Sequence, residues 1–242
     1  MLIDVKSELR TQGYSVARGD QLLVDSVARE AERALASEWN NLGLDNYLKN
    51  GARFRERRYG RFYYLPMDNI IRLLTHKPYF QSHAANVYAG GIRRIVEPLT
   101  ETSVKNPLLK ALIEFDFAQF PVSEDLLGYP WEVTCHQFRI VATVNEVGEP
   151  TPEGIHRDEV DFGVIHLMSR SNVEGGYSRI YDNSKKLKVE LLLESPMDTL
   201  FWVDHDVLHS VTPITCKNAD RPAIRDVLGI TYKFDPGLCE VD

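Results

Sequence analysis

Residues 136–163, HQFRIVATVNEVGEPTPEGIHRDEVDFG, lead from a β-rich run through a turn-rich loop to a second apolar run. Branched and aromatic residues indicate strands on both sides, and the Gly and Pro residues between them indicate a reversal of the chain. His156 and Asp158 stand two residues apart where the second run begins. Residues two apart on a strand point to the same face, so this segment predicts an imidazole and a carboxylate aimed at one point.

Short β-rich runs continue on both sides of this segment, from Trp131 to Phe234. Turn residues separate them, as in VEGG (173–176) and DNSKK (182–186). Many short strands at close spacing predict an antiparallel sandwich or barrel. The runs are EVTCHQFRIVATV, VDFGVIHLMS, YSRIYD, LKVELLL, DTLFWVD, DVLHSVTPI and RDVLGITYKF.

Two stretches before residue 125 have helical periodicity instead. In residues 20–39, Asp20 is a suitable N-cap, and the apolar positions Leu23, Val27, Ala31, Ala34 and Leu35 recur at helical spacing. In residues 106–120, Pro107 stands near the start of a second helix with one apolar side, formed by Leu108, Leu109, Leu112 and Ile113. The pattern predicts one α+β domain over residues 1–242, mainly β, with a helix-rich part (1–125) packed outside a β core (126–242).

Composition excludes several function classes. No apolar run among the 242 residues is long enough to cross a bilayer, and the formal net charge of −7 argues against a general nucleic-acid binder. Three widely separated cysteines fit reduced thiols better than a disulfide framework, and the first residues lack the pattern of a secretory signal. We therefore expect a cytoplasmic protein with neither a membrane nor a nucleic-acid partner.

A metal site is the best explanation of the HxD pair once a third ligand is considered. The stretch DTLFWVDHDVLHSVTPI ends a strand in a polar turn and then presents His209. Two histidines and one carboxylate on one face of a metal, with the opposite positions open, are the arrangement of non-haem Fe(II) oxygenases. His205 competes for the third position, but it stands between two aspartates at a turn.

An arginine follows His209, as an oxygenase of this type requires. A planar guanidinium holds the distal carboxylate of a 2-oxo acid with two parallel hydrogen bonds. Arg225 opens the last predicted strand and is the first candidate, and Arg221, before Pro222, is the second.

This order of HxD, distal His and Arg resembles the 2-oxoglutarate- and Fe(II)-dependent dioxygenases, which are built on a double-stranded β-helix of jelly-roll or cupin-like form. More narrowly, residues 136–163, VEGGYSRIYD, HSVTPI and RDVLGITY look like the bacterial family typified by L-isoleucine hydroxylase, whose members hydroxylate free aliphatic amino acids. The resemblance covers about residues 58–234.

The resemblance implies roles for several residues. His156, Asp158 and His209 would bind Fe(II) and carry catalysis, and Arg225 would bind the 5-carboxylate of 2-oxoglutarate. Succinate and CO2 would be released, O2 would be consumed, and ascorbate would serve as reductant in vitro. Related halogenases replace the metal-binding carboxylate by a small residue, so Asp158 favours hydroxylation, with sulfoxidation of methionine left open.

Candidates for the substrate site come from residues 53–66, RFRERRYGRFYYLP. If this stretch is a strand, Arg53, Arg55, Arg57 and Arg61 share one face, whereas Arg58 shares the other face with aromatic residues. A solvated arginine face explains the first set. We therefore expect Arg58 to bind the carboxylate of the substrate, with Arg57 and Arg61 as weaker candidates.

Further candidates lie beside the metal motif. Gln137 and Arg139 share one face of the strand before it, and His136, Phe138 and Ile140 share the other, but the sequence does not decide which face lines the cavity. Glu159 could accept the ammonium group of an amino acid or lie on the loop surface. Three further residues are interpreted as core residues: His166, Trp131 and Trp202.

Two other functions remain open at this level. The same three ligands could hold a divalent ion in a cupin-like isomerase or hydrolase that does not use 2-oxoglutarate. The barrel could also be a metal-binding or signalling module without turnover. Neither the identity of the amino acid, free or carrier-bound, nor the oligomeric state follows from the sequence.

Overall fold

The computed structural model describes residues 4–19, 29–84 and 86–239. The helices in these ranges are α1 (Val5–Gln12), α2 (Arg29–Ser37), α3 (Glu101–Lys105) and α4 (Pro107–Gln119), with short 3-10 helices η2 (Glu38–Asn41), η3 (Lys49–Gly51) and η4 (Glu124–Leu126). The strands are β1 (Tyr14–Ala17), β2 (Gly43–Leu44), β3 (Arg55–Leu65), β4 (Ile70–Leu73), β5 (Trp131–Ala142), β6 (Phe162–Ser171), β7 (Val173–Gly175), β8 (Ser178–Tyr181), β9 (Leu187–Leu191), β10 (Thr199–Val203), β11 (Leu208–Val211), β12 (Ile214–Cys216) and β13 (Ala223–Phe234). Every β-rich run after Trp131 thus forms strand structure, as predicted.

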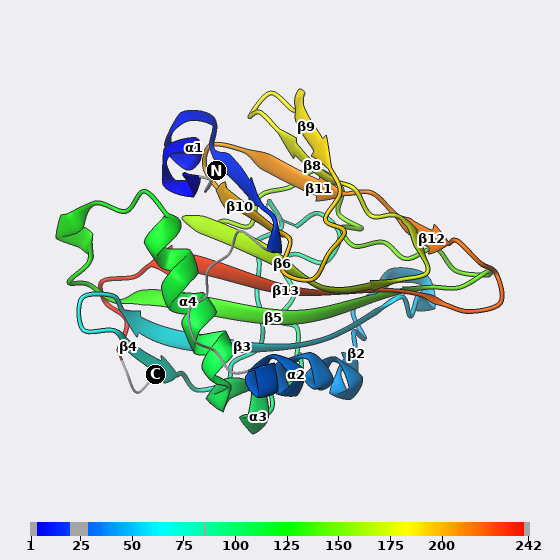
Figure 1. Ribbon diagram of the computed structural model, residues 1–242, viewed down its shortest axis with the longest axis horizontal. Helices are drawn as coiled ribbons and strands as arrows, with labels where there is room; N and C mark the ends of the chain where they lie inside the picture. The colour runs from blue at the N-terminus through cyan, green and yellow to red at the C-terminus, as the bar shows by residue number, and fades with distance from the viewer. Residues whose placement is uncertain (1–3, 20–28, 85, 240–242) are drawn as a thin grey trace.

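The described strands form one large and two small antiparallel sheets (Figure 1). The large sheet has the order β1-β10-β6-β13-β5-β3-β2, with β4 beside β3. The small sheets have the orders β11-β8-β9 and β12-β7. Residues 1–125 therefore do more than cover the core with helices, because they also supply β1 to β4.

Strand β3 is the main addition from the N-terminal part. It pairs with β5 along ten residues, from Arg55 opposite Ile140 to Tyr64 opposite Trp131. Its alternation of polar and aromatic residues is compatible with a strand that has two different faces. The faces differ because helices pack on one side and a cavity lies on the other.

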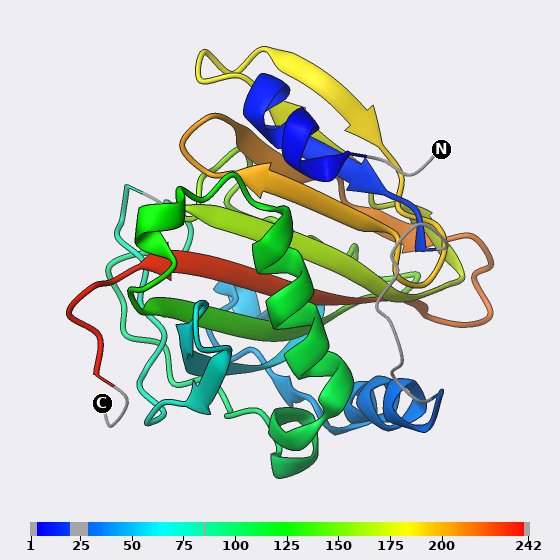
Figure 2. The ribbon, with the colours of Figure 1, turned by 60° about the vertical axis from the view of Figure 1, so that its left-hand side comes forward.

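Helix α4 covers the first face of the large sheet and crosses in front of β3, β5 and β13 (Figures 1 and 2). It begins as the sequence predicted, with Pro107 in its first turn and with the Asn106 side chain accepting a hydrogen bond from the Leu108 amide. The predicted apolar side is buried against the sheet. Helix α2 is described from Arg29, with Ala31 and Leu35 buried as expected; the predicted N-cap Asp20 and the positions Leu23 and Val27 lie outside the described residues.

A buried polar chain ties α4 to the sheet. His166 of β6 contacts Asp116 of α4 at 2.9 Å and Thr199 of β10 at 2.7 Å. Both His166 and Asp116 are fully buried, which confirms that His166 is a hydrogen-bonded core residue. Trp131 also packs in this core, as predicted.

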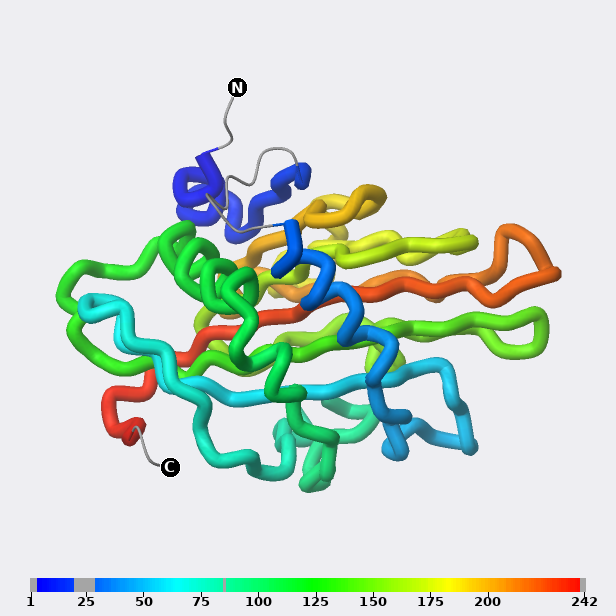
Figure 3. The backbone as a smooth tube through the Cα atoms, turned by 60° about the horizontal axis from the view of Figure 1, so that its bottom comes forward, coloured from blue at the N-terminus to red at the C-terminus, as the bar shows by residue number. Residues whose placement is uncertain are grey.

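The loops that follow β5 and precede β13 extend together from one end of the sheet (Figure 3). Between β4 and α3, by contrast, the described residues of 74–100 contain little regular structure apart from two bridges, one between Tyr79 and Arg94 and one between Pro98 and Tyr59 of β3. No helix within the described ranges is long and apolar enough to span a membrane.

Candidate metal centre and its cavity

The second face of the large sheet lines a cavity of about 550 Å³. Alternate residues of three neighbouring strands point into it: Arg55, Arg57, Tyr59 and Arg61 of β3; Glu132, Thr134, His136, Phe138 and Ile140 of β5; Arg225, Val227, Gly229, Thr231 and Lys233 of β13. Trp202 of β10, a strand of the same sheet, and His209 and Val211 of β11, from the small sheet, also line it. Small-molecule sites have volumes of roughly 300–1,000 Å³, so the cavity has a suitable size.

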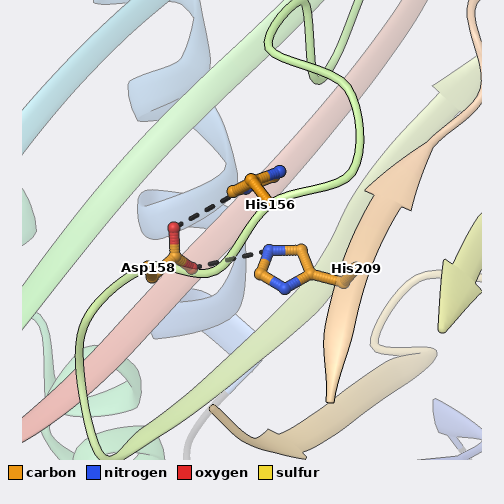
Figure 4. Close-up of side chains that lie close together, drawn as sticks. All are labelled: His156, Asp158 and His209. Carbon is orange, nitrogen blue, oxygen red and sulfur yellow. Dashed lines mark ion pairs between the residues drawn. The ribbon is translucent and has the colours of Figure 1, made fainter. Parts of the chain in front are cut away.

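His156, Asp158 and His209 meet at the wall of this cavity (Figure 4). His156 and His209 form an antiparallel bridge in which each amide donates to the other carbonyl at 3.0 Å. Residues paired in this way present their side chains on the same face, and the two rings lie 4.2 Å apart. The backbone bridge therefore brings the distant histidine to the HxD pair.

Asp158 completes the cluster. One carboxylate oxygen lies 3.7 Å from Nε2 of His156, and the other lies 3.5 Å from Nε2 of His209. One potential ligand atom from each residue lies within 4.8 Å of the other two. Asp158 itself is in the loop after the bridge, not on a strand as predicted.

The ring orientation of His156 is fixed by its other nitrogen. Nδ1 lies 2.9 Å from the carbonyl oxygen of Gly154. A carbonyl only accepts, so Nδ1 carries the proton and Nε2 keeps its lone pair for a ligand.

Asp204 supports the loop that carries Asp158. This fully buried carboxylate accepts hydrogen bonds from the amides of Asp158 (3.1 Å) and Val160 (3.3 Å). It also accepts one from the indole of Trp202 at 3.2 Å, and the Trp202 ring contacts His209 at 4.7 Å. Trp202, predicted to be only a packing residue, therefore also links Asp204 to the metal-binding cluster.

Burial and neighbouring charges set the protonation of the cluster. Burial raises the pKa of Asp158 to about 6, although His156 opposes the shift. Burial lowers the pKa of His209 well below its usual range. Burial also lowers the pKa of His156, but Asp158 and Glu153 outweigh it and the net shift is upward. A carboxylate and a neutral imidazole at neutral pH are suited to bind a divalent cation.

Arg225 enters the cavity from β13 and is 2% exposed. Within the described residues, its Nε and Nη2 atoms have no hydrogen-bond partner. Burial and the neighbouring Arg170 lower its pKa to about 10, so it remains a cation at neutral pH. A buried, unpartnered guanidinium is costly unless it meets an anion, so this residue is suited to a carboxylate ligand.

Arg221 and His205 lie elsewhere. Arg221 is exposed in the loop before β13, where its carbonyl accepts from Asn172. The His205 side chain is 68% exposed and faces Asp206. Neither alternative candidate belongs to the cavity lining.

Three predicted substrate residues lie on the face of the sheet that is turned away from the cavity. Arg58 donates to the carbonyls of Asn41 and Pro98 and pairs with Glu97. Gln137 donates to Ser103, and Arg139 forms a double hydrogen bond with Asp226. The alternation was correct, but all three side chains lie outside the cavity lining, on the face of the sheet that packs against the helices. For Arg58 this is the opposite of the expected face, and for Gln137 and Arg139 it decides a choice that the sequence left open.

The weaker candidates do line the cavity. Arg57 is 3% exposed, and Arg61 forms a double hydrogen bond with Glu132 at 3.0 and 2.7 Å. The arginine face of β3, predicted to be solvated, is therefore the inner face. Glu159 lies at the exposed rim and accepts from Ser82 at 2.6 Å.

Several lining residues were missed because they lie in the irregular segment 74–100. Tyr79, Gln81 and Arg94 reach the cavity from this segment. The available signal was its length, since long segments without regular structure in compact domains are often functional. Glu153, 3.5 Å from His156 Nε2, was also missed.

The sequence profile of the family described as 2OG-Fe dioxygenase matches residues 36–231. The chain belongs to the 2OG-Fe dioxygenase family. A similar relative is 3(1)-hydroxy-L-isoleucine 4-dioxygenase of Pantoea ananatis, 29% identical over 96% of both chains. L-isoleucine-4-hydroxylase of Bacillus thuringiensis is 28% identical over 74% of this chain and 75% of that protein. The crystal structure of a BsmA homologue from Methylobium petroleophilum is 31% identical and has a TM-score of 0.85, covering 96% of this chain and 94% of the other.

Membership in the 2OG-Fe dioxygenase family establishes three sequence predictions. The core is a double-stranded β-helix, the protein is an oxygenase, and Fe(II), 2-oxoglutarate and O2 are its cofactor and cosubstrates. The cluster of two imidazoles and one carboxylate fits Fe(II). The family assignment thus favours a 2-oxoglutarate-dependent oxygenase over the two alternative functions, a metal enzyme without 2-oxoglutarate and a module without turnover.

Proposed function

We propose that this dioxygenase hydroxylates an aliphatic side chain of a free L-amino acid. The amino acid and 2-oxoglutarate consume one O2, and the products are the hydroxylated amino acid, succinate and CO2. Both named relatives act, by their names, on isoleucine or hydroxyisoleucine, which supports an amino acid as substrate. The observation that carries the proposal is the presence of the donor cluster and the unpartnered Arg225 in one cavity.

In this proposal His156, Asp158 and His209 hold Fe(II). The bound iron supplies the oxidative decarboxylation of 2-oxoglutarate and the insertion of oxygen into the substrate. The chain fixes the positions of the ligands, through the bridge between the histidines and through Asp204. Trp202 and the strand residues around the cluster keep bulk water from one side of it.

Arg225 binds the 5-carboxylate of 2-oxoglutarate. Its guanidinium is buried, carries a full charge at neutral pH and has free donors for two parallel hydrogen bonds. Gly176 packs over it, since a Cβ at this glycine would lie 3.4 Å from Arg225 Cδ. The position of the guanidinium is thereby restricted, which favours a single orientation of the cosubstrate.

The remaining candidates are assigned to the substrate. Arg57 is better placed than Arg61 to bind its carboxylate, because Arg61 is already engaged by Glu132. Glu132 of the lining is engaged by Arg61. Glu159 at the rim and Glu153 near the metal ligands also line the cavity and are candidates for the ammonium group. We also propose a cytoplasmic location, for which Cys135, Cys216 and Cys239, all free thiols, provide the support.

The test is a panel of free L-amino acids, including isoleucine, leucine and methionine, with Fe(II), 2-oxoglutarate, ascorbate and O2. Succinate and a mass gain of one oxygen are measured for each amino acid. We expect His156→Ala to abolish both, and His205→Ala, the matched exposed histidine, to retain both. Succinate release without oxidation of any amino acid would contradict the proposal, and oxidation of methionine alone would show sulfur as the acceptor.

A further inference from the structure

A second group of buried charges lines the same cavity. Arg55, Arg57 and Arg94 line it and are 6%, 3% and 2% exposed, and their partner Asp45, outside the lining, is 3% exposed. The arginines come from β3 and from the irregular segment 74–100, so distant parts of the chain converge here. Three guanidiniums against one carboxylate leave a surplus of positive charge.

Asp45 is largely occupied by one of the three arginines. Its Oδ2 accepts from Arg55 Nε at 2.9 Å and lies 2.8 Å from Arg55 Nη2. Its Oδ1 accepts from the amide of Tyr47 at 3.0 Å. Little hydrogen-bonding capacity remains for the other two arginines.

Arg57 lacks hydrogen-bond acceptors for this reason. Its Nε lies 3.0 Å from Asp45 Oδ2, but within the described part of the chain neither Nε nor Nη2 makes a hydrogen bond. Burial and Arg55 lower its pKa to about 10, so it is nevertheless charged at neutral pH. Asp45 thus pairs with Arg57 by charge but leaves donors of this buried cation unsatisfied, which is destabilising unless a further acceptor reaches them.

Arg94 is the second incompletely paired cation. Nη2 donates to Gln81 Oε1 at 2.7 Å, a neutral acceptor, and Nε has no partner in the described ranges. Its guanidinium lies 4.7 Å from the ring of Tyr79, which faces Arg57 at 5.7 Å. Both guanidiniums thus contact the same ring at the cavity wall, and Arg94 is close enough to Arg57 to lower its pKa.

Tyr79 also connects this cluster with the metal ligands. Burial raises the pKa of its hydroxyl, and Asp158 acts in the same direction, whereas Arg94 and Arg57 act against it. Tyr79, Asp158 and the two arginines all line the one cavity. A small molecule bound to the arginines therefore shares this cavity with the metal ligands.

We propose that Arg57 and Arg94 form the binding site for the α-carboxylate of the amino acid, separate from the site of 2-oxoglutarate at Arg225. This inference rests on the proposed function and deepens it. Two carboxylate sites in one cavity match two carboxylate ligands. The substrate must then be a free acid, because an amino acid tethered to a carrier through its carboxyl group has no carboxylate to offer.

The test compares an acid with its amide. The pair is L-isoleucine and L-isoleucinamide, or the best substrate found in the amino-acid panel and its carboxamide. The two members have the same side chain, but the acid carries a charged α-carboxylate and the amide a neutral carboxamide. In the unaltered enzyme we expect the acid to have the higher kcat/KM. Arg57→Met and Arg94→Met should each lower kcat/KM for the acid by about 10–150-fold, the range expected from hydrogen bonds to a charged group, and for the amide by much less.

Two readouts separate this role from a structural one. The KM for 2-oxoglutarate should stay unchanged in both variants, and Arg94→Lys should recover part of the discrimination between acid and amide. Arg53→Met, an exposed arginine outside the cavity lining, is the control and should behave as the unaltered enzyme.

The outcomes distinguish the two proposals. If amino acids are oxidised but the variants discriminate acid from amide as before, or raise the KM for 2-oxoglutarate instead, the arginine site is overturned and the proposed function stands. If no amino acid is oxidised by the unaltered enzyme, both proposals fail.

Discussion

Two arginines near the start of β13 have opposite surroundings. Arg225 is buried in the cavity with free donors, whereas Arg221 is exposed in the preceding loop. The sequence named both as candidates for 2-oxoglutarate, because both follow the distal histidine, and placed Arg225 first because it opens the last predicted strand. Because one is buried in the cavity and the other is exposed, Arg221 is a suitable control for substitutions of Arg225.

Arg225→Met should raise the KM for 2-oxoglutarate by about 10–150-fold, because hydrogen bonds to a charged group contribute about 1.5–3 kcal/mol. Arg221→Met should leave this KM unchanged. Initial rates of succinate formation at varied 2-oxoglutarate measure both. Equal KM values in the two variants would exclude a role for Arg225 in binding the cosubstrate.

Asp204 provides a second prediction at the scale of the residue. An amide in its place has one acceptor oxygen for three donors, the amides of Asp158 and Val160 and the indole of Trp202. Asp204→Asn should weaken Fe(II) binding by about 10–100-fold, as expected for groups that orient ligands. Anaerobic Fe(II) titration measures the affinity, and the exposed Asp206→Asn is the control.

At the scale of the elements, the pairing of β6 with β10 positions Trp202 against His209. Gly163 of β6 is opposite Trp202 in this pairing. A Cβ at Gly163 would lie 2.2 Å from an indole carbon, so the absence of a side chain leaves room for the ring. The same glycine ends the segment that contains the HxD pair, and its role depends on a strand that is distant in sequence.

Gly163→Ala should lower the free energy of unfolding by about 1–3 kcal/mol through overpacking. It should also weaken Fe(II) binding, since Trp202 contacts His209 and Asp204. Gly229→Ala on β13 is the stability control, because its Cβ would meet only Phe138 at 3.9 Å. Chemical denaturation of both variants tests the prediction, and equal losses would contradict it.

For the whole molecule, metal binding and folding are coupled through the buried cluster. The pKa of Asp158 is about 6 in the folded protein and 3.8 in an unperturbed carboxyl group. The folded metal-free state therefore binds this proton more tightly, and Asp158 contributes less to the free energy of unfolding as the pH rises through this interval. Fe(II) has the opposite preference, because it requires the carboxylate.

Fe(II) at about 100 times its Kd should raise the free energy of unfolding by about 2.7 kcal/mol at pH 7.5. For a chain of this size this corresponds to a rise in Tm of about 5–11 °C. The shift should shrink below pH 6, when Asp158 is protonated, and disappear with a chelator. Anaerobic thermal unfolding measures it, and an equal shift in His209→Ala would place the metal elsewhere.

The sequence by itself determined the β core, the helices α2 and α4 in their described parts, and the donor set His156, Asp158 and His209. Periodicity and residue chemistry are local properties, and the order of the HxD pair and the distal histidine can be read directly from the sequence. It also gave the correct alternation along β3 and β5. These features need no knowledge of what packs against each element.

Only the tertiary structure decided which face of the large sheet became the cavity wall. Alternation makes Arg57 and Arg58 point in opposite directions, but the packing of helices against one face determines which of them is inside. Likewise, the contacts of Arg94 and Tyr79 with β3, and of Trp202 with Gly163, join residues far apart in sequence. Their positions follow from long-range packing, which local pattern does not encode.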